Sequence, residues 1–359
     1  MIRQLVTQRQ ISNLQPIEGA DRIELATVDG WKVVVKKGEF KVGDRGVYFE
    51  IDSFLPKSDE RFAFLMQKGS SREYNGTVGA ILRTVRLRGQ VSQGLILPLG
   101  LFSDEELAAE SMQDALGIQK WEPPIPAELH GDVAGPLPKH LFPVTEQERV
   151  QNLSFDQVDE LLKNEPDLIA EVKLDGTSMS VYHNNGVYGV CGRNWEFKPT
   201  TVNSLTRAAD ALNLKGRLAE LGRNIALQGE LVGYGINGNN EQLRGQEFVI
   251  FDIWLIDEMR YASFAEKIDT IFRLFGLEEL EPIGELLQIH SRLVPVLVAE
   301  IDSSTNPSNF VERILNLANG VSRNPTVKRE GLVFKTRDRR ISFKAISNDY
   351  LLGEQALER

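Results

Sequence analysis

Several charged residues lie inside otherwise apolar segments of this sequence, where their side chains could do chemistry. In the segment 169–176 (IAEVKLDG), the alternation of a strand places Glu171 and Lys173 on one face, and Asp175 follows directly. Four more charged residues have similarly apolar neighbours: Glu230, Glu330, Lys335 and Lys344. Burying such groups unpaired is costly, so we expect them to meet one another, a metal ion or a ligand. The alternative is a set of structural salt bridges on a solvated face.

The segments around these residues predict a mixed domain from about residue 151 onward. Short apolar runs with β-branched residues predict strands, and the turn 184–186 (Asn-Asn-Gly) joins two of them. Capping residues, prolines and glycines predict helices from Ser154 to Pro166, from Ser204 to Leu221, around 263–275, and from Pro307 to Gly320. This order of elements favours an α+β domain with antiparallel sheets.

The first hundred residues have a different character. They contain about five short β-rich segments separated by turns such as Asp29-Gly30, which predicts a small β-barrel, and an OB-fold is the natural candidate. They hold 15 Lys or Arg against 11 Asp or Glu, whereas the whole chain has a net charge of −10. Their basic side chains concentrate in one stretch, namely Lys68, Arg72, Arg83, Arg86 and Arg88. This stretch could bind a polyanion, although a solvated surface face explains the charge equally well.

A proline-rich segment separates the two parts. Six prolines between Pro123 and Pro143 disfavour regular helix there. We therefore expect an OB-fold domain at 1–105, a connector at 106–145 and a larger second domain at 146–359.

The composition excludes several classes of protein. With 359 residues, 42% hydrophobic and 26% charged, the chain is typical of a folded protein of two or three domains. No run approaches the ~18 apolar residues of a membrane span, and the first residues lack a signal peptide, so no membrane association and a cytoplasmic location are expected. The single cysteine, Cys191, excludes an internal disulfide framework, and four scattered histidines disfavour a zinc site. A monomer is the expected state.

Read in order, the charged segments resemble the motif series of covalent nucleotidyltransferases, the superfamily of RNA ligases, ATP-dependent DNA ligases and mRNA capping enzymes. The series comprises KLDG at 173–176, QGELVG around Glu230, FVIFDIW at 248–254, REGLVFK around Glu330, and SFKAIS around Lys344. It implies an ATP-grasp-like ligase adenylation domain. A β-rich domain that precedes this series is similar to the arrangement in the RNA-ligase branch with an N-terminal OB domain, whose members seal nicks in duplexes.

The resemblance implies three chemical steps and a role for each motif residue. Lys173 attacks the α-phosphorus of ATP and becomes lysyl-AMP, AMP moves to a 5′-phosphate, and a 3′-OH then displaces it. Asp175, Glu230 and Glu330 would hold a hydrated Mg²⁺ or Mn²⁺, because carboxylates alone would raise the pKa of the lysine.

The remaining candidates would contact the nucleotide. The series implies that Lys344 and Lys335 stabilise the phosphate charge and that Phe251 stacks on adenine, although Phe248 could equally be that ring. Arg193 would touch the ribose or a 5′-phosphate, and Glu171 the adenine amino group. Arg149 would contact the nucleotide phosphates, with a surface ion pair as the alternative. One departure is Ser342, which replaces the first lysine of the usual Lys-x-Lys in the last motif.

Two other signals point away from chemistry. The GxGxxG pattern at 233–238 is not followed by a clear helix start, so we interpret it as a flexible loop beside the active site and not as a dinucleotide site. Cys191 has no histidine placed to activate it, which favours a buried strand residue.

Three other functions remain open from the sequence. Two of them use the same chemistry, namely an ATP-dependent DNA ligase and a capping-type guanylyltransferase. The third is not an enzyme but a nucleic-acid-binding protein with a degenerate catalytic half. The sequence favours an ATP-dependent RNA ligase active in RNA repair, whose partner is RNA or an RNA/DNA duplex with a nick.

Overall fold

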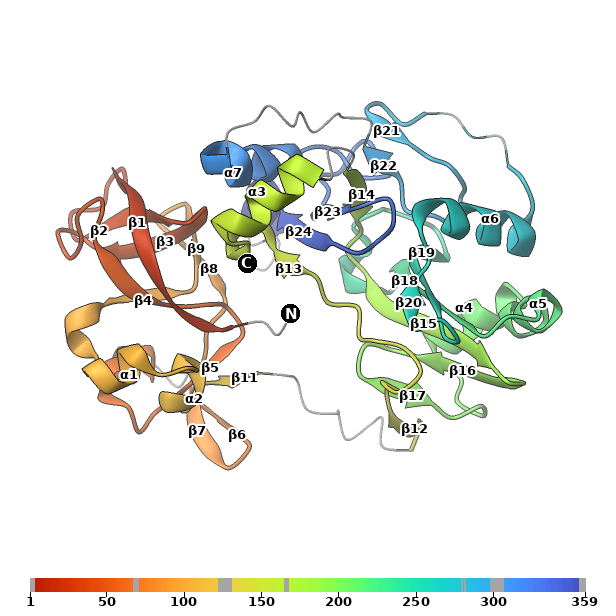
Figure 1. The fold of residues 1–359 in the computed structure, drawn as a ribbon, viewed down its shortest axis with the longest axis horizontal. Coiled ribbons are helices and arrows are strands. Elements are labelled where there is room, and N and C mark those ends of the chain that lie inside the picture. Colours follow the sequence, from red (N-terminus) through yellow and green to blue (C-terminus); the bar gives the residue numbers. More distant parts are fainter. Residues whose placement is uncertain are drawn as a thin grey trace. The chain divides into compact units, whose positions relative to one another are not determined.

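The structure is a computed structural model that describes residues 4–66, 71–121, 131–164, 168–278, 280, 282–297 and 307–354. The chain forms two compact units, one within residues 1–124 and 351–359 and the other within 125–350 (Figure 1). We describe each unit by itself.

The N-terminal unit is built on a five-stranded antiparallel sheet of order β10-β4-β1-β2-β3. Its strands are β1 (Val6–Pro16), β2 (Ile23–Val28), β3 (Trp31–Lys36), β4 (Arg45–Phe49) and β10 (Leu95–Pro98). A four-stranded sheet of order β11-β5-β7-β6 comprises β5 (Ser53–Pro56), β6 (Arg72–Tyr74), β7 (Thr77–Ile81) and β11 (Gln119–Lys120). A separate hairpin joins β8 (Thr84–Leu87) and β9 (Gln90–Gln93). This β-rich unit confirms the expected OB-fold class.

Short helices complete the N-terminal unit. They are η1 (Glu60–Met66), η2 (Leu99–Leu101), α1 (Asp104–Ala108) and α2 (Met112–Ala115). The sequence pattern did not reveal β1, although it pairs with both β2 and β4. Only three of its eleven residues, Val6, Ile11 and Leu14, are aliphatic, so it lacks the alternation that marks a half-buried strand.

The second unit contains two large sheets. The seven-stranded sheet has the order β12-β17-β16-β15-β18-β19-β20, with β12 (Val133–Pro136), β15 (Thr177–Asn184), β16 (Val187–Cys191), β17 (Trp195–Phe197), β18 (Ile225–Gly233), β19 (Gln246–Leu255) and β20 (Arg260–Tyr261). The six-stranded sheet has the order β13-β24-β23-β14-β22-β21, with β13 (Glu148–Arg149), β14 (Ile169–Lys173), β21 (Leu286–Leu287), β22 (Val296–Leu297), β23 (Gly331–Lys335) and β24 (Ser342–Ile346). The pairing is antiparallel as predicted, except that β13 and β24 are parallel.

Helices cover one face of each sheet in the second unit. Next to the six-stranded sheet, α3 (Phe155–Asn164) and α7 (Pro307–Ala318) lie side by side (Figure 1) and share its apolar core. The seven-stranded sheet packs against α4 (Ser204–Ala211), α5 (Leu214–Leu221) and α6 (Phe264–Phe275). The last elements are η4 (Val150–Asn152), η5 (Asn237–Asn239) and α8 (Asn348–Glu354). The α+β class is therefore confirmed.

The helix predicted over residues 204–221 is two helices. Asn213 has a φ of 47°, in the left-handed region, and α5 begins directly after it. Asparagine tolerates this conformation better than most residues. The apolar residues of both helices still reach one core, which explains why their spacing resembled a single helix.

No helix in the described parts of the chain is long and apolar enough to span a membrane.

Candidate active site

Lys173 is the last residue of β14, and its amine faces a carboxylate from the next strand. Lys173 pairs with Gly331, so the neighbouring Glu330 lies at the same end of the sheet. Its Nζ atom donates to Oε2 of Glu330 at 2.6 Å. A Cβ atom at Gly331 would lie 2.1 Å from the carbonyl oxygen of Ala345, so only glycine lets β23 and β24 approach this closely. The charged groups were expected to meet one another, a metal ion or a ligand, and Lys173 and Glu330 meet each other.

The other two predicted carboxylates also act on Lys173. Burial would lower the pKa of Lys173, but the negative charges of Glu330, Glu230 and Asp175 outweigh burial and raise this pKa above its ordinary value. A protonated amine has no lone pair for attack on phosphorus. The carboxylate charges therefore favour the protonated form of Lys173, and a nearby positive charge would oppose them.

The pKa of Glu230 is raised as well, but here burial is the main cause. Glu230 lies on β18, opposite Ser178 of β15 and Val249 of β19. Burial raises its pKa to about 7, the charges of Glu330 and Asp175 add to this, and Lys173 and Arg193 oppose it. This carboxyl therefore changes charge near neutral pH.

The donor set fits a hydrated divalent cation. Asp175, Glu230 and Glu330 offer only carboxylate oxygens, which are the ligands that Mg²⁺ and Mn²⁺ prefer. Within the described residues, no three His, Cys, Asp or Glu side chains are close enough together to coordinate a metal ion directly. Glu330 already bonds to Lys173, and Asp175 accepts a hydrogen bond from Tyr350. The arrangement therefore suits a cation that keeps most of its water molecules.

The strand register places further charged residues on the face of Lys173. Glu171 of β14 is opposite Val333 of β23, and Val333 is opposite Lys344 of β24. Residues opposite each other in a sheet share a face, so Lys344 lies two strands from Glu171 on the same side. Arg149 of β13 is paired with Lys344 in the parallel ladder. The sheet thus brings Lys173, Lys344 and Arg149 to one surface.

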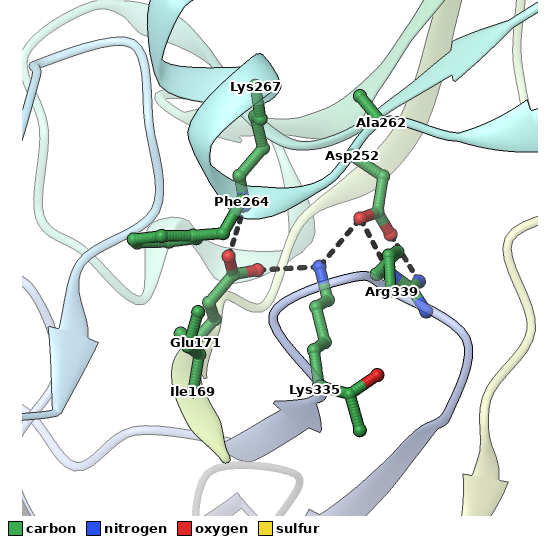
Figure 2. Close-up of a pocket in the computed structure, with 9 residues that line it drawn as sticks. Ile169, Glu171, Asp252, Ala262, Phe264, Lys267, Lys335 and Arg339 are labelled. Carbon is green, nitrogen blue, oxygen red and sulfur yellow. Dashed lines mark hydrogen bonds and ion pairs between the residues drawn. The ribbon is translucent and has the colours of Figure 1, made fainter. Parts of the chain in front are cut away.

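Two predicted contact residues, Glu171 and Lys335, take part in a buried ionic network (Figure 2). The Nζ atom of Lys335 is 2.6 Å from Oε2 of Glu171 and 3.0 Å from Oδ1 of Asp252. Lys267 of α6 contacts the other oxygen of Glu171, and Arg339 forms a two-bond ion pair with Asp252. Lys335 is 3% exposed, and Glu171 is 1% exposed. For these two residues, the structure shows salt bridges, but in a buried network and not on the solvated face of the alternative interpretation.

The network lines a small pocket. Its walls also include Ile169, Ala262, Phe264 and Thr336. In Figure 2, the Lys335 amine points between the Glu171 and Asp252 carboxylates. Lys335 pairs with Ile169, at the end of β14 opposite to Lys173.

Phe251 and Phe248 occupy different surroundings. Phe248 is 1% exposed in the core between the seven-stranded sheet and its helices. Phe251 lies at a β-bulge, where Gln228 is opposite Asp252 and Gly229 is opposite Ile250. The bulge lets two consecutive residues, Phe251 and Asp252, face the six-stranded sheet. Phe251 is partly buried there, with the Lys335 Nζ atom 5.6 Å from its ring centre.

Arg193 is the most exposed candidate. Its side chain is 59% exposed and lies 3.9 Å from Glu146. Its charge lowers the pKa of Glu230, which places it within electrostatic range of the carboxylates. Cys191, by contrast, is buried and burial raises its pKa, as expected for a residue of the strand core.

Sequence reasoning missed five residues that contact the site: Asn237, Asp252, Lys267, Arg339 and Tyr350. Asp252 had a usable signal, because it is an acid inside the apolar strand 248–254. Lys267 sits within an amphipathic helix, where a charged residue is ordinary. Tyr350 and Arg339 lie in segments with no distinguishing pattern.

Comparisons with known proteins agree with this geometry. A family described as RNA ligase matches residues 166–346, and one described as an OB-fold domain matches residues 5–99. No curated protein matches the chain.

Solved structures of a Naegleria gruberi RNA ligase are similar over the full length. A lysine mutant with ATP and Mn is 42% identical, with a TM-score of 0.78 and coverage of 99% of this chain and 100% of that one. A glutamate mutant with AMP and Mn is 42% identical, with a TM-score of 0.79 and the same coverage. The ligase with PPi is 42% identical, with a TM-score of 0.78 and coverage of 100% of both chains. The chain belongs to the RNA ligase family, in a form with an N-terminal OB-fold domain.

Proposed function

We propose that this protein is an ATP-dependent RNA ligase that joins 3′-OH and 5′-phosphate ends through lysyl-AMP and an adenylated 5′-phosphate. The observation that carries the proposal is the Lys173 amine at 2.6 Å from Glu330, with Glu230 and Asp175 in electrostatic range. Related structures hold ATP, AMP and Mn, which supports the same nucleotide and Mg²⁺ or Mn²⁺ here.

The first step needs Lys173 to lose a proton. A divalent cation held by the three carboxylates supplies the positive charge that lowers the lysine pKa. Glu330 lies in hydrogen-bond contact with Nζ and can accept the proton. The nitrogen then forms a bond to the α-phosphorus of ATP, while the bond from that phosphorus to the pyrophosphate oxygen breaks.

Charge on the α-phosphate oxygens grows as that bond forms, and fixed cations stabilise it. Lys344 and Arg149 are proposed for this role because the sheet brings them to the face of Lys173. Arg193 is proposed to contact the 5′-phosphate in the second step, since it is exposed and close enough to affect Glu230. Lys335 has a different proposed role, since its amine already lies between two carboxylates: it positions Glu171.

The adenine is proposed to stack on Phe251, whose ring lies next to Lys335 of the pocket in Figure 2. The bulge turns Phe251 toward the six-stranded sheet, where a base could stack on its ring. A Glu171 carboxylate oxygen would accept a hydrogen bond from the adenine amino group. Guanine has a carbonyl oxygen in that position, which would repel the carboxylate.

The N-terminal unit is proposed to bind the nucleic-acid backbone near a nick. Arg83, Arg86 and Arg88 are exposed on and around the β8–β9 hairpin. We propose the division into an OB-fold domain at 1–105, a connector at 106–145 and an adenylation domain at 146–359. We also propose that the protein acts as a monomer in the cytoplasm.

The test has two stages. In the first, the protein is incubated with ATP or GTP and a divalent cation, and the mass of the intact chain is measured. We expect a gain of one AMP with ATP, no gain with GTP, and no gain for Lys173→Ala. GMP addition would instead indicate a guanylyltransferase, and no addition with any nucleotide would overturn the ligase proposal.

The second stage uses nicked duplexes with RNA or DNA on each side of the break. We expect sealing to require RNA on the 3′-OH side. Efficient sealing of all-DNA nicks would favour a DNA ligase.

A further inference from the structure

Both carboxylate oxygens of Asp175 are contacted by residues outside the motif series. The hydroxyl of Tyr350 donates to Oδ2 at 2.7 Å. The Nδ2 atom of Asn237 lies 3.4 Å from Oδ1 of Asp175. The same Nδ2 atom donates a hydrogen bond to the carbonyl oxygen of Gly176. The first contact is a short, strong hydrogen bond and the second is weaker.

Tyr350 is held in place by the start of α8. Ser347 caps this helix, because its Oγ atom accepts a hydrogen bond from the Tyr350 backbone N–H at 3.1 Å. The Ser347 backbone N–H donates to the carbonyl oxygen of Glu330 at 2.8 Å, and its hydroxyl donates to Asn319 at 2.9 Å. Tyr350 is 6% exposed. The first turn of α8 is therefore anchored at Glu330, one predicted metal ligand, and its Tyr350 contacts a second, Asp175.

The glycine-rich segment 233–238 explains the position of Asn237. Gly233 has a φ of 115°, and a Cβ atom there would lie 2.1 Å from the carbonyl oxygen of Gly245. Asn237 itself has a φ of 38°, in the left-handed region. The GxGxxG pattern thus serves a tight turn that carries an amide to Asp175.

We propose that Tyr350, assisted by Asn237, is a positioning residue that orients Asp175 for the divalent cation of lysine adenylation. This inference rests on the proposed function. A carboxylate that binds a cation through water must present its oxygens in a fixed direction, and a hydroxyl on Oδ2 prevents rotation. Removing such outer hydrogen bonds typically weakens metal binding by about 10- to 100-fold.

The central variant is Tyr350→Phe, which removes one oxygen and keeps the ring. Its matched control is Tyr182→Phe. Tyr182 is 4% exposed in the same unit, and its hydroxyl donates to the Glu196 carboxylate at 2.6 Å. Both variants lose a partly buried hydrogen bond between a tyrosine and a carboxylate, but only one of these bonds reaches Asp175.

Two readouts are compared in wild type and both variants. One is the Mn²⁺ concentration that gives half-maximal adenylation of Lys173. The other is the rise in thermal midpoint that Mn²⁺ causes in the presence of a non-hydrolysable ATP analogue. We expect Tyr350→Phe to need about tenfold more Mn²⁺ in both measurements. Tyr182→Phe should lower the midpoint without changing the Mn²⁺ dependence.

A second pair of variants keeps the test informative if Tyr350→Phe does not fold. Asn237→Gly removes the amide, and glycine accepts the positive φ without strain. Asn185→Gly is its control, because Asn185 has a φ of 49° in the turn at the far end of β15. We expect a smaller rise in the Mn²⁺ requirement, of about threefold, for Asn237→Gly only.

Equal Mn²⁺ dependence of wild type, Tyr350→Phe and Asn237→Gly would overturn the positioning role. Failure of the wild type itself to take up AMP would instead count against the proposed function. The two failures are therefore distinguishable in one set of measurements.

Discussion

The Lys335 ammonium lies between two carboxylates, 2.6 Å from Glu171 and 3.0 Å from Asp252. Lys267 and Arg339 contact the same two acids, so the network contains three cations and two anions. Burial lowers the pKa of Lys335, and the positive charges of Lys267 and Arg339 lower this pKa further. The network is therefore more tolerant of losing a positive charge than of losing a negative one.

This charge balance predicts different costs for two substitutions. Asp252→Asn leaves three buried cations with one carboxylate and should destabilise the protein by about 3–5 kcal/mol. Lys335→Met leaves one cation for each acid and should cost less than half as much. Urea unfolding of the two variants measures both values. Equal losses would show that the excess charge does not control stability.

The bulge predicts that two phenylalanines three residues apart have separate roles. Phe248→Ala should cost about 3–5 kcal/mol in unfolding free energy, because Phe248 fills the core. Phe251→Ala should cost less and should raise the KM for ATP at least fivefold, because it removes the proposed stacking surface. Urea unfolding and adenylation kinetics separate these effects. If Phe248→Ala raised the KM for ATP more than Phe251→Ala, Phe248 and not Phe251 would be the ring that stacks on adenine.

The raised pKa of Glu230, about 7, predicts a pH dependence of stability. Between the ordinary carboxyl pKa and this value, the folded protein binds a proton that the unfolded chain has lost, so stability falls as pH rises through this window. Glu230→Gln lacks this titration. The free energy of unfolding of Glu230→Gln minus that of wild type should therefore rise between pH 4.5 and pH 8, by up to about 3 kcal/mol.

Thermal midpoints in EDTA, without nucleotide, check the Glu230 prediction. The control is wild type with Mn²⁺ and a non-hydrolysable ATP analogue, where a bound cation should favour the ionised carboxylate and remove the difference. A stability difference that does not change with pH would show that Glu230 keeps an ordinary pKa.

The basic hairpin predicts salt-dependent binding of nucleic acid. Arg88 has a φ of 49°, so Arg88→Asn removes its charge while keeping a residue that accepts this conformation. If Arg88 contacts a phosphate, the slope of log K against log salt should fall by about 1 for a nicked duplex. Arg273→Gln is a control, because this exposed arginine of α6 pairs with Asp269 in its own helix. An unchanged slope for Arg88→Asn would exclude this contact.

The sequence predicted most of the local structure of the second unit. The strand GLVFK has the predicted limits, and the predicted capping box of α3 is present, with Ser154 and Gln157 bonding to each other. Local patterns sufficed here because strand alternation and helix caps depend on neighbours in the sequence. Within the N-terminal unit, β1 was not predicted because apolar and polar residues do not alternate along it. Only its pairing with β2 and β4 defines it as a strand.

For the candidate site, the sequence alone determined which residue types are present, their order, and that Glu171 and Lys173 share a strand face. It could not determine the partner of each charged residue, because the alternation of side chains along a strand does not show which strand lies next to it in the sheet. Tertiary structure decided that Lys173 meets Glu330, that Lys335 is held by Glu171 and Asp252, and that a bulge redirects Phe251. It also brought Tyr350 to Asp175 across 175 positions of the chain. Such contacts depend on register, bulges and loop closure, which arise only when distant segments pack together.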